Sequence, residues 1–130
     1  MDKAIGYLRI LFHILTLLII ILSLYPGSIL GFLFYGSFEY YPQISRNFLY
    51  ISTNHFYAYF LLSILGFFSY LKDEKFKLII IYLFFLSFFL EILHFVIPER
   101  FFEISDLLSN ILGVLIAYMV VLTYNFLKNK

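Results

Sequence analysis

The sequence predicts an all-α, polytopic membrane protein, with about four transmembrane helices in an antiparallel bundle and one short interfacial or re-entrant segment. Of its 130 residues, 63% are hydrophobic and only 13% are charged, whereas soluble domains carry about a quarter charged residues. Four segments without an internal proline approach the roughly 20 residues that cross a hydrocarbon core. They are expected to be helices, because lipid leaves the edges of an open sheet without hydrogen-bond partners. Residues 1–130 then form a single domain.

The first expected span covers residues 5–24. It follows the short charged start Met1-Asp2-Lys3, as in a signal peptide, but the stretch SLYPGS behind it lacks the small-x-small pattern of a cleavage site. We therefore expect this segment to remain in the protein as a membrane anchor.

A shorter apolar segment follows at residues 29–35, between a Pro-Gly break at 26–27 and a Gly-Ser break at 36–37. It is too short to cross a bilayer. We expect it to lie in the interface or to dip in part way, with the neighbouring tyrosines at the level of the lipid headgroups.

Three longer apolar segments complete the chain, at residues 54–71, 76–97 and 105–126. The loops between them, LKDEKFK and PERFFEI, are short. Short loops favour antiparallel neighbours, so these spans are expected to pack side by side.

The distribution of Lys and Arg predicts the orientation. One side of the predicted membrane receives Lys3, Arg9, Lys72, Lys75, Lys77, Lys128 and Lys130. The other side receives only Arg46 and Arg100. Because cytoplasmic loops carry the excess of positive charge, both termini are expected to be cytoplasmic.

Composition also excludes several classes of function. A net charge of +1 gives no basic surface for nucleic acid. The absence of cysteine excludes disulfides, thiolate metal sites and cysteine nucleophiles, and we expect no cofactor. The bias towards Phe, Ile, Leu, Tyr, Lys and Asn is typical of an AT-rich bacterial genome, which suggests a bacterial plasma membrane.

Polar residues concentrate where three spans reach the outer side. Glu91 and His94 lie in the last turns of the third span, and Asp106 and Asn110 share one face of the fourth. The second span starts on the outer side, with His55 and Tyr59 one turn apart. Three helices are therefore expected to direct polar side chains to one level.

Ionisable groups inside a span are costly and usually face the bundle interior or a wet cavity. Glu91 and His94 are thus candidates for an acid–base pair, although an interhelical hydrogen-bond clamp would use the same residues. Arg100, in the outer loop, is suited to bidentate binding of a carboxylate or phosphate. One E-x-x-H spacing, even with His55 and Asp106 nearby, is a weak metal signal, so the sequence predicts no metal site. Glu99 and Glu103 are interpreted as solvated loop charges.

These residues carry a resemblance to the VanZ-like family of small membrane proteins. The stretch NHFYAYFLL is followed by E-x-x-polar-x-x-x-P-x-R-x-x-x-x-x-D-x-x-x-N-x-x-G, over about residues 50 to 120. The matching residues are His55, Tyr59, Glu91, His94, Pro98, Arg100, Asp106, Asn110 and Gly113. The chain departs from the family pattern at His94, where the family usually has Gln, and at Ile51 and Ser52, where it usually has an Asp-Lys pair.

The resemblance implies an integral membrane protein from a family whose founding member is associated with resistance to the glycopeptide teicoplanin. Three functions are open. The first is an outward-facing pocket that binds an envelope component or an antibiotic and so affects antibiotic susceptibility. The second is an enzyme that uses Glu91 or His94 as general base on a lipid-linked substrate, with Arg100 stabilising developing charge. The third is a non-catalytic partner that packs against another membrane protein through a small-residue seam, which includes Gly113 and Ala117.

Overall fold

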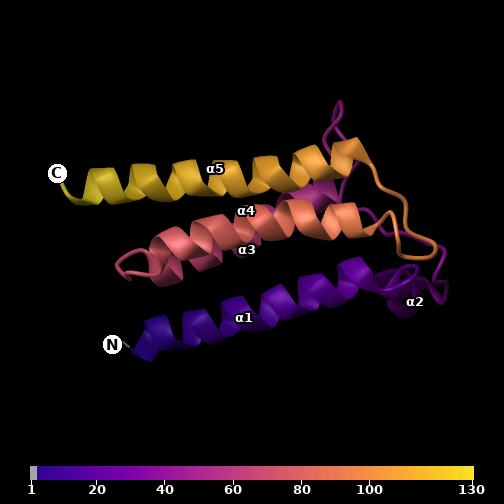
Figure 1. The fold of residues 1–130 in the computed structure, drawn as a ribbon, viewed down its shortest axis with the longest axis horizontal. Helices are drawn as coiled ribbons and strands as arrows, with labels where there is room; N and C mark the ends of the chain where they lie inside the picture. Colours follow the sequence, from indigo (N-terminus) through magenta and orange to yellow (C-terminus); the bar gives the residue numbers. More distant parts are fainter. Residues whose placement is uncertain (1–2) are drawn as a thin grey trace.

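The computed structural model describes residues 3–130, and these residues are almost entirely helical. The helices are α1 (Lys3–Leu24), α2 (Ile29–Tyr35), α3 (Thr53–Tyr70), α4 (Phe76–Leu93) and α5 (Ile104–Lys128). Within this described part the only β pairing is an isolated bridge between Phe48 and Ile51. The four long helices run along one axis, with both chain ends at one end of the bundle and α2 at the other (Figure 1). The predicted all-helical fold class is confirmed.

Three of the helices, α1, α4 and α5, are long and apolar enough to cross a membrane by length and composition. The less apolar α3 packs against all three of them. Its buried face includes the polar side chains of Ser63, Ser69 and Tyr70. A helix enclosed by other helices exposes little side-chain surface to lipid, so α3 can carry polar groups that an outer helix would not.

Helix α4 ends at Leu93, four residues before the predicted limit at residue 97. Beyond it the backbone turns with three-residue hydrogen bonds, such as His94 N–H to the carbonyl of Glu91 at 3.1 Å. The cause is Pro98, which removes one backbone donor, clashes with the carbonyl four residues earlier and disfavours helical geometry in the residue before it. The early end places Glu91 in the last turn of α4 and His94 at its C-cap.

Helices α3 and α5 make the most extensive contact between helices of the described residues, and the small-residue seam of α5 lies in that contact. A Cβ atom added to Gly113 would lie 2.7 Å from the carbonyl oxygen of Phe56 and 2.9 Å from the backbone nitrogen of Phe60. Ala117, one turn further along α5, is fully buried. The seam therefore brings the two backbones close enough for short polar side chains to meet at the helix tips.

At the end of the bundle that holds the termini, α1 is attached to the end of α3. The Arg9 guanidinium lies 2.6 Å from the Asp73 carboxylate and donates to the carbonyl of Ser69 at 3.0 Å. One turn later His13 bonds the hydroxyl of Tyr70 at 3.0 Å through Nε2. His13 thus has a packing role at the end of the bundle opposite to α2.

The short helix α2 lies beside the opposite end of the bundle (Figure 1). Ser28 caps its first turn by accepting a hydrogen bond from the backbone of Gly31 at 2.9 Å. Gly36 ends it with a left-handed φ of 70°, a conformation that glycine adopts at little cost. Leu33 and Phe34 of α2 are well exposed, which fits a helix that lies at a membrane surface.

Candidate functional site

The predicted site residues from three helix tips converge in the structure, and His55 lies at their centre. Its Nδ1 is 3.0 Å from Oδ1 of Asn110, and its Nε2 is 3.2 Å from Oδ2 of Asp106. Its Nδ1 also lies 4.0 Å from Oε2 of Glu91. One imidazole from α3 therefore meets a carboxylate from α4 and two polar side chains from α5.

Glu91 is the deepest charged residue of the site, with 1% of its surface exposed. Its Oε1 lies 3.1 Å from Nδ1 of His94 and accepts a hydrogen bond from the backbone N–H of Glu103 at 3.3 Å. The backbone contact comes from the N-cap residue of α5. Glu91 thus joins the end of α4 to the start of α5, which agrees with the clamp interpretation.

His94 extends the site to α1, which the sequence did not indicate. Its Nε2 lies 3.2 Å from the hydroxyl and 3.1 Å from the carbonyl oxygen of Ser23. His94 is 3% exposed. The carbonyl of Ser23 accepts an N–H from Nε2, so Nδ1 is left to accept a hydrogen from Glu91 or to carry a second proton.

Asn110 is held in a defined orientation. Its Nδ2 donates to the carbonyl of Ser87 on α4 at 3.3 Å, so its Oδ1 faces His55. Beside it, Ser109 accepts a hydrogen bond from the backbone of Ser52 at 2.7 Å. The first turns of α3 and α5 are therefore joined by both a side-chain and a backbone contact.

Arg100 has a structural role that the sequence did not reveal. Its Nε donates to the carbonyl of Tyr25 at 3.1 Å and its Nη2 donates to the carbonyl of Leu22 at 2.5 Å. These carbonyls lie at the C-terminal end of α1, where a cation is favoured by the helix dipole. Burial lowers the pKa of Arg100, while Tyr41, Glu91 and Asp106 raise it, and an arginine stays charged throughout.

Two neighbouring cavities open at this end of the bundle. The first, of about 400 Å³, is lined by polar groups that include His55, His94, Arg100 and Asp106, together with Glu99 and Glu103. The second, of about 390 Å³, is mostly apolar and includes Ile19, Phe34, Ala58 and Tyr59. Both volumes lie in the range of small-ligand sites.

Tyr59 takes its place in the wall of the apolar cavity, below the polar cluster. It is 3% exposed, and its hydroxyl donates to the carbonyl of Leu86 at 3.4 Å. The other predicted site residues, His55, Glu91, His94, Arg100, Asp106 and Asn110, meet at the polar end. Glu99 and Glu103 are exposed, as expected of solvated charges, yet both border the polar cavity.

Several groups of the site lay outside the sequence prediction. They are Ser23, Ser87 and Ser109, the backbone N–H of Glu103, and the carbonyls of Leu22 and Tyr25. Serines inside apolar helices are common, and backbone groups carry no sequence signal. Only the position of Ser23 at the outer end of the first predicted span, level with His94, offered a hint.

The comparisons with known proteins identify a family. The family model described as VanZ/LLP1 matches residues 7–127. Searches of curated proteins and of solved structures found no match to the chain.

Proposed function

Because this chain belongs to the VanZ/LLP1 family, whose model matches nearly its whole length, we propose that it is a bacterial plasma-membrane protein that binds a lipid-linked envelope component. The binding site faces outward, and both termini lie in the cytoplasm. Occupation of this site affects susceptibility to antibiotics that act on the envelope, including glycopeptides.

The observation that carries the proposal is that the polar and apolar cavities share a wall. His55, His94 and Arg100 border both of them, as do Leu22, Leu30 and Pro42. A molecule that fills both cavities has a polar headgroup next to an apolar chain. Amphiphiles of this kind are anchored in one leaflet of the bilayer that the four-helix bundle would span.

The polar cavity supports recognition of an anionic or amide-bearing headgroup. Arg100 offers five N–H donors, and two of its nitrogens are engaged by backbone carbonyls. The remaining donors are available for a phosphate or carboxylate. Glu99 and Glu103 at the rim provide acceptors for sugar hydroxyls or amides.

Filling the apolar cavity tests the proposal. Ala58 lines this cavity, so Ala58→Phe places a ring where the apolar chain would lie. Leu61→Phe is the matched control, because Leu61 lies on the same helix and is 62% exposed. A lipid-linked cell-wall precursor and teicoplanin serve as probes with the purified protein in nanodiscs.

We expect wild-type protein and Leu61→Phe to bind the precursor, and Ala58→Phe to bind it at least tenfold more weakly. Teicoplanin binding with the same dependence on Ala58 would identify the antibiotic itself as a ligand. Equal precursor binding by all three proteins, or no binding by the wild type, would contradict the proposal.

A second function is favoured by one specific feature, since His55 and His94 each lie beside a carboxylate within 3.2 Å. Such pairs are suited to moving a proton, as in acid–base catalysis on a lipid-linked substrate. Turnover of the bound precursor by the wild type, lost in His55→Gln while binding is retained, would identify an enzyme. Binding without turnover would leave the binding function alone.

A further inference from the structure

We propose that His55, Glu91 and Asp106 hold a divalent transition-metal ion, which rests on the proposed function because the ion would lie in the wall of the headgroup cavity. One donor atom from each of these residues lies within 4.8 Å of the other two. The three residues belong to α3, α4 and α5. The sequence spacing predicted no metal, because the donors come from three separate helices and only the fold brings them together.

The hydrogen bonds around His55 determine which ring nitrogen is free. Asn110 donates through Nδ2 to the carbonyl of Ser87, so the atom that it presents to Nδ1 of His55 is an acceptor oxygen. Nδ1 must therefore carry a hydrogen. This arrangement, in which one nitrogen donates to a fixed oxygen, is how proteins orient a metal-binding histidine.

The other nitrogen, Nε2, lies 3.2 Å from Oδ2 of Asp106. In the neutral ring, two lone-pair atoms then face each other, which is unfavourable unless a second ring proton or a metal ion lies between them. Two ligands on one zinc ion, each at roughly 2.0–2.2 Å in tetrahedral geometry, are about 3.3–3.5 Å apart. The observed separation of Nε2 and Oδ2 is close to that value.

Glu91 has one oxygen that the protein leaves open to a ligand. Its Oε1 has two partners, His94 and the N–H of Glu103. Its Oε2 has no hydrogen bond within residues 3–130, and it lies 4.0 Å from Nδ1 of His55, on the edge of the ring that faces Asn110. The Oε2 atom is therefore not engaged by the protein and can take a ligand that enters the cluster.

The donor set identifies the class of ion. One imidazole nitrogen and two carboxylate oxygens suit Zn²⁺ or Mn²⁺ better than Mg²⁺ or Ca²⁺, which prefer oxygen alone. Two carboxylates and a neutral imidazole also balance the charge of a divalent ion. The three donors lie within 4.8 Å of one another, against about 3.3–3.5 Å for ligands of one zinc ion, so the side chains must move closer to hold it. The fourth position would face the polar cavity, because His55 and Asp106 line it, and is therefore open to water or a headgroup oxygen.

The test is metal binding by the full chain in nanodiscs after removal of metal with a chelator. Zn²⁺ or Mn²⁺ is added alone, and binding is measured by equilibrium dialysis with elemental analysis. We expect about one ion per chain, and at least a tenfold loss of affinity in Asp106→Asn and in Glu91→Gln. X-ray absorption of the bound ion should show one imidazole among oxygen ligands.

Glu103→Gln is the matched control, because its carboxylate borders the same cavity but contacts Ser105 instead of the cluster. It should bind the ion like the wild type. Asn110→Ala should weaken binding about 10–100-fold by releasing the orientation of His55. If Glu91→Gln does not fold, Asp106→Asn still decides the matter, because the Asp106 side chain is 17% exposed and has a solvated surface.

The metal site would be overturned if the wild type bound less than about one ion per chain. It would also be overturned if Glu103→Gln and Asp106→Asn lost the same metal affinity. Precursor binding is measured separately on the chelator-treated protein and on the same protein with metal restored. Precursor binding without any metal binding would leave the proposed function intact and refute the ion alone. Metal binding without precursor binding would support the ion and refute the proposed function.

Discussion

Glu91 links the helices at the end of the bundle that holds the candidate site. It is buried, and one of its oxygens joins His94 to the backbone at the start of α5. Removing one partner of a buried polar pair leaves the others without hydrogen bonds, and this usually costs more than the pair itself contributes. Glu91 thus combines a structural role with its place in the candidate site.

We predict that Glu91→Ala lowers the free energy of unfolding by about 3 kcal/mol. The substitution leaves His94 and the N–H of Glu103 without their common acceptor. Thermal or denaturant unfolding in a defined detergent measures the change. Glu74→Ala, in an exposed loop, should stay within about 0.5 kcal/mol of the wild type. A similar loss in both variants would show that Glu91 is not a structural anchor.

Asp73 gives a prediction on pH at the other end of the bundle. Its pKa lies below the usual value of 3.8, chiefly because the carboxylate accepts a hydrogen bond from the backbone of Lys75 and further because of Arg9. A carboxylate with a lowered pKa in the folded state stabilises the fold above its unfolded pKa and loses this effect as the pH falls through the folded value.

Asp73→Asn should therefore destabilise the protein at pH 7, and the difference from wild type should disappear as the pH falls through the lowered pKa of Asp73. Asparagine keeps an acceptor for the Lys75 N–H, so the variant isolates the charge. Unfolding measured across this pH range checks the effect. A difference that grows towards low pH would have the wrong sign for a stabilising ion pair.

Some side-chain positions in the candidate site could be predicted from the sequence, and others could not. Glu91, His94, Asp106 and Asn110 were predictable as one cluster, because helical spacing sets their faces and proline sets their depth. The engagement of Arg100 by the end of α1 was not predictable. That contact depends on backbone carbonyls, which every residue has, and on a loop whose path follows from packing.

At the scale of elements, the approach of α5 to α3 controls the geometry of the site. Gly113 leaves no room for a Cβ, and the atoms in the way belong to the α3 backbone. At Gly66 an added Cβ would meet the ring of Phe12 at 2.7 Å instead. A side chain can rotate or shift, whereas a helix backbone moves only as a body.

We predict that Gly113→Ala destabilises the bundle by about 1–3 kcal/mol, even though alanine raises helix propensity by roughly 1 kcal/mol. Gly66→Ala, the matched variant, should cost less. Because α3 and α5 carry His55, Asp106 and Asn110, Gly113→Ala should also weaken ligand binding. Unfolding and precursor binding measured on both variants check this, and a stabilising Gly113→Ala would contradict the packing argument.

The helices themselves were largely predictable, and the exceptions have identifiable causes. Expected segments 5–24, 54–71 and 105–126 differ from α1, α3 and α5 by two residues or fewer at each end. The segment at 29–35 coincides with α2. The expected segment 76–97 was too long because apolar residues continue past the point where Pro98 ends the helix. Apolar composition indicates which residues can lie in lipid, whereas the backbone geometry of proline determines the residue at which α4 ends.

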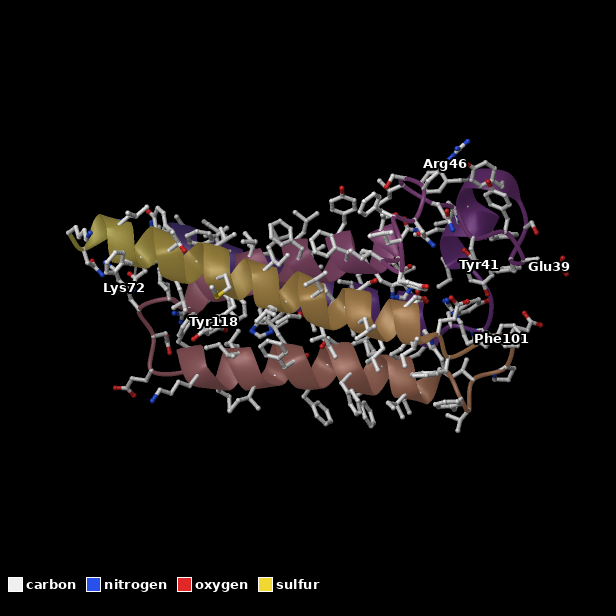
Figure 2. The ribbon with its side chains drawn as sticks, turned by 90° about the horizontal axis from the view of Figure 1, so that it is seen from above. Glu39, Tyr41, Arg46, Lys72, Phe101 and Tyr118 are labelled. Atoms are coloured by element: carbon white, nitrogen blue, oxygen red, sulfur yellow. The ribbon has the colours of Figure 1, made fainter. Side chains whose placement is uncertain are left out.

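At the scale of the whole molecule, the bundle has two different ends. The termini lie together at one end, and α2 lies at the other (Figure 1). Lys72 is at the end opposite to Tyr41 and Phe101 (Figure 2). The site, both cavities and the aromatic loops share the end that is poor in lysine. An even number of crossings would place both termini on one side of the membrane, and the lysines predict that this side is cytoplasmic.

We predict accordingly that the loop after α4 faces the exterior and the loop after α3 faces the cytoplasm. The chain has no cysteine, so Phe101→Cys and Glu74→Cys each carry one thiol at an exposed position. A membrane-impermeant thiol reagent applied to intact cells should label Phe101→Cys, and should label Glu74→Cys only after the cells are broken. The reverse pattern would place the pocket on the cytoplasmic side, where a site for an outer-leaflet headgroup or an external antibiotic has no access to its ligand. Labelling of both positions in intact cells would mean that α3 and α4 do not separate them across the bilayer, and the four-span topology would then be wrong.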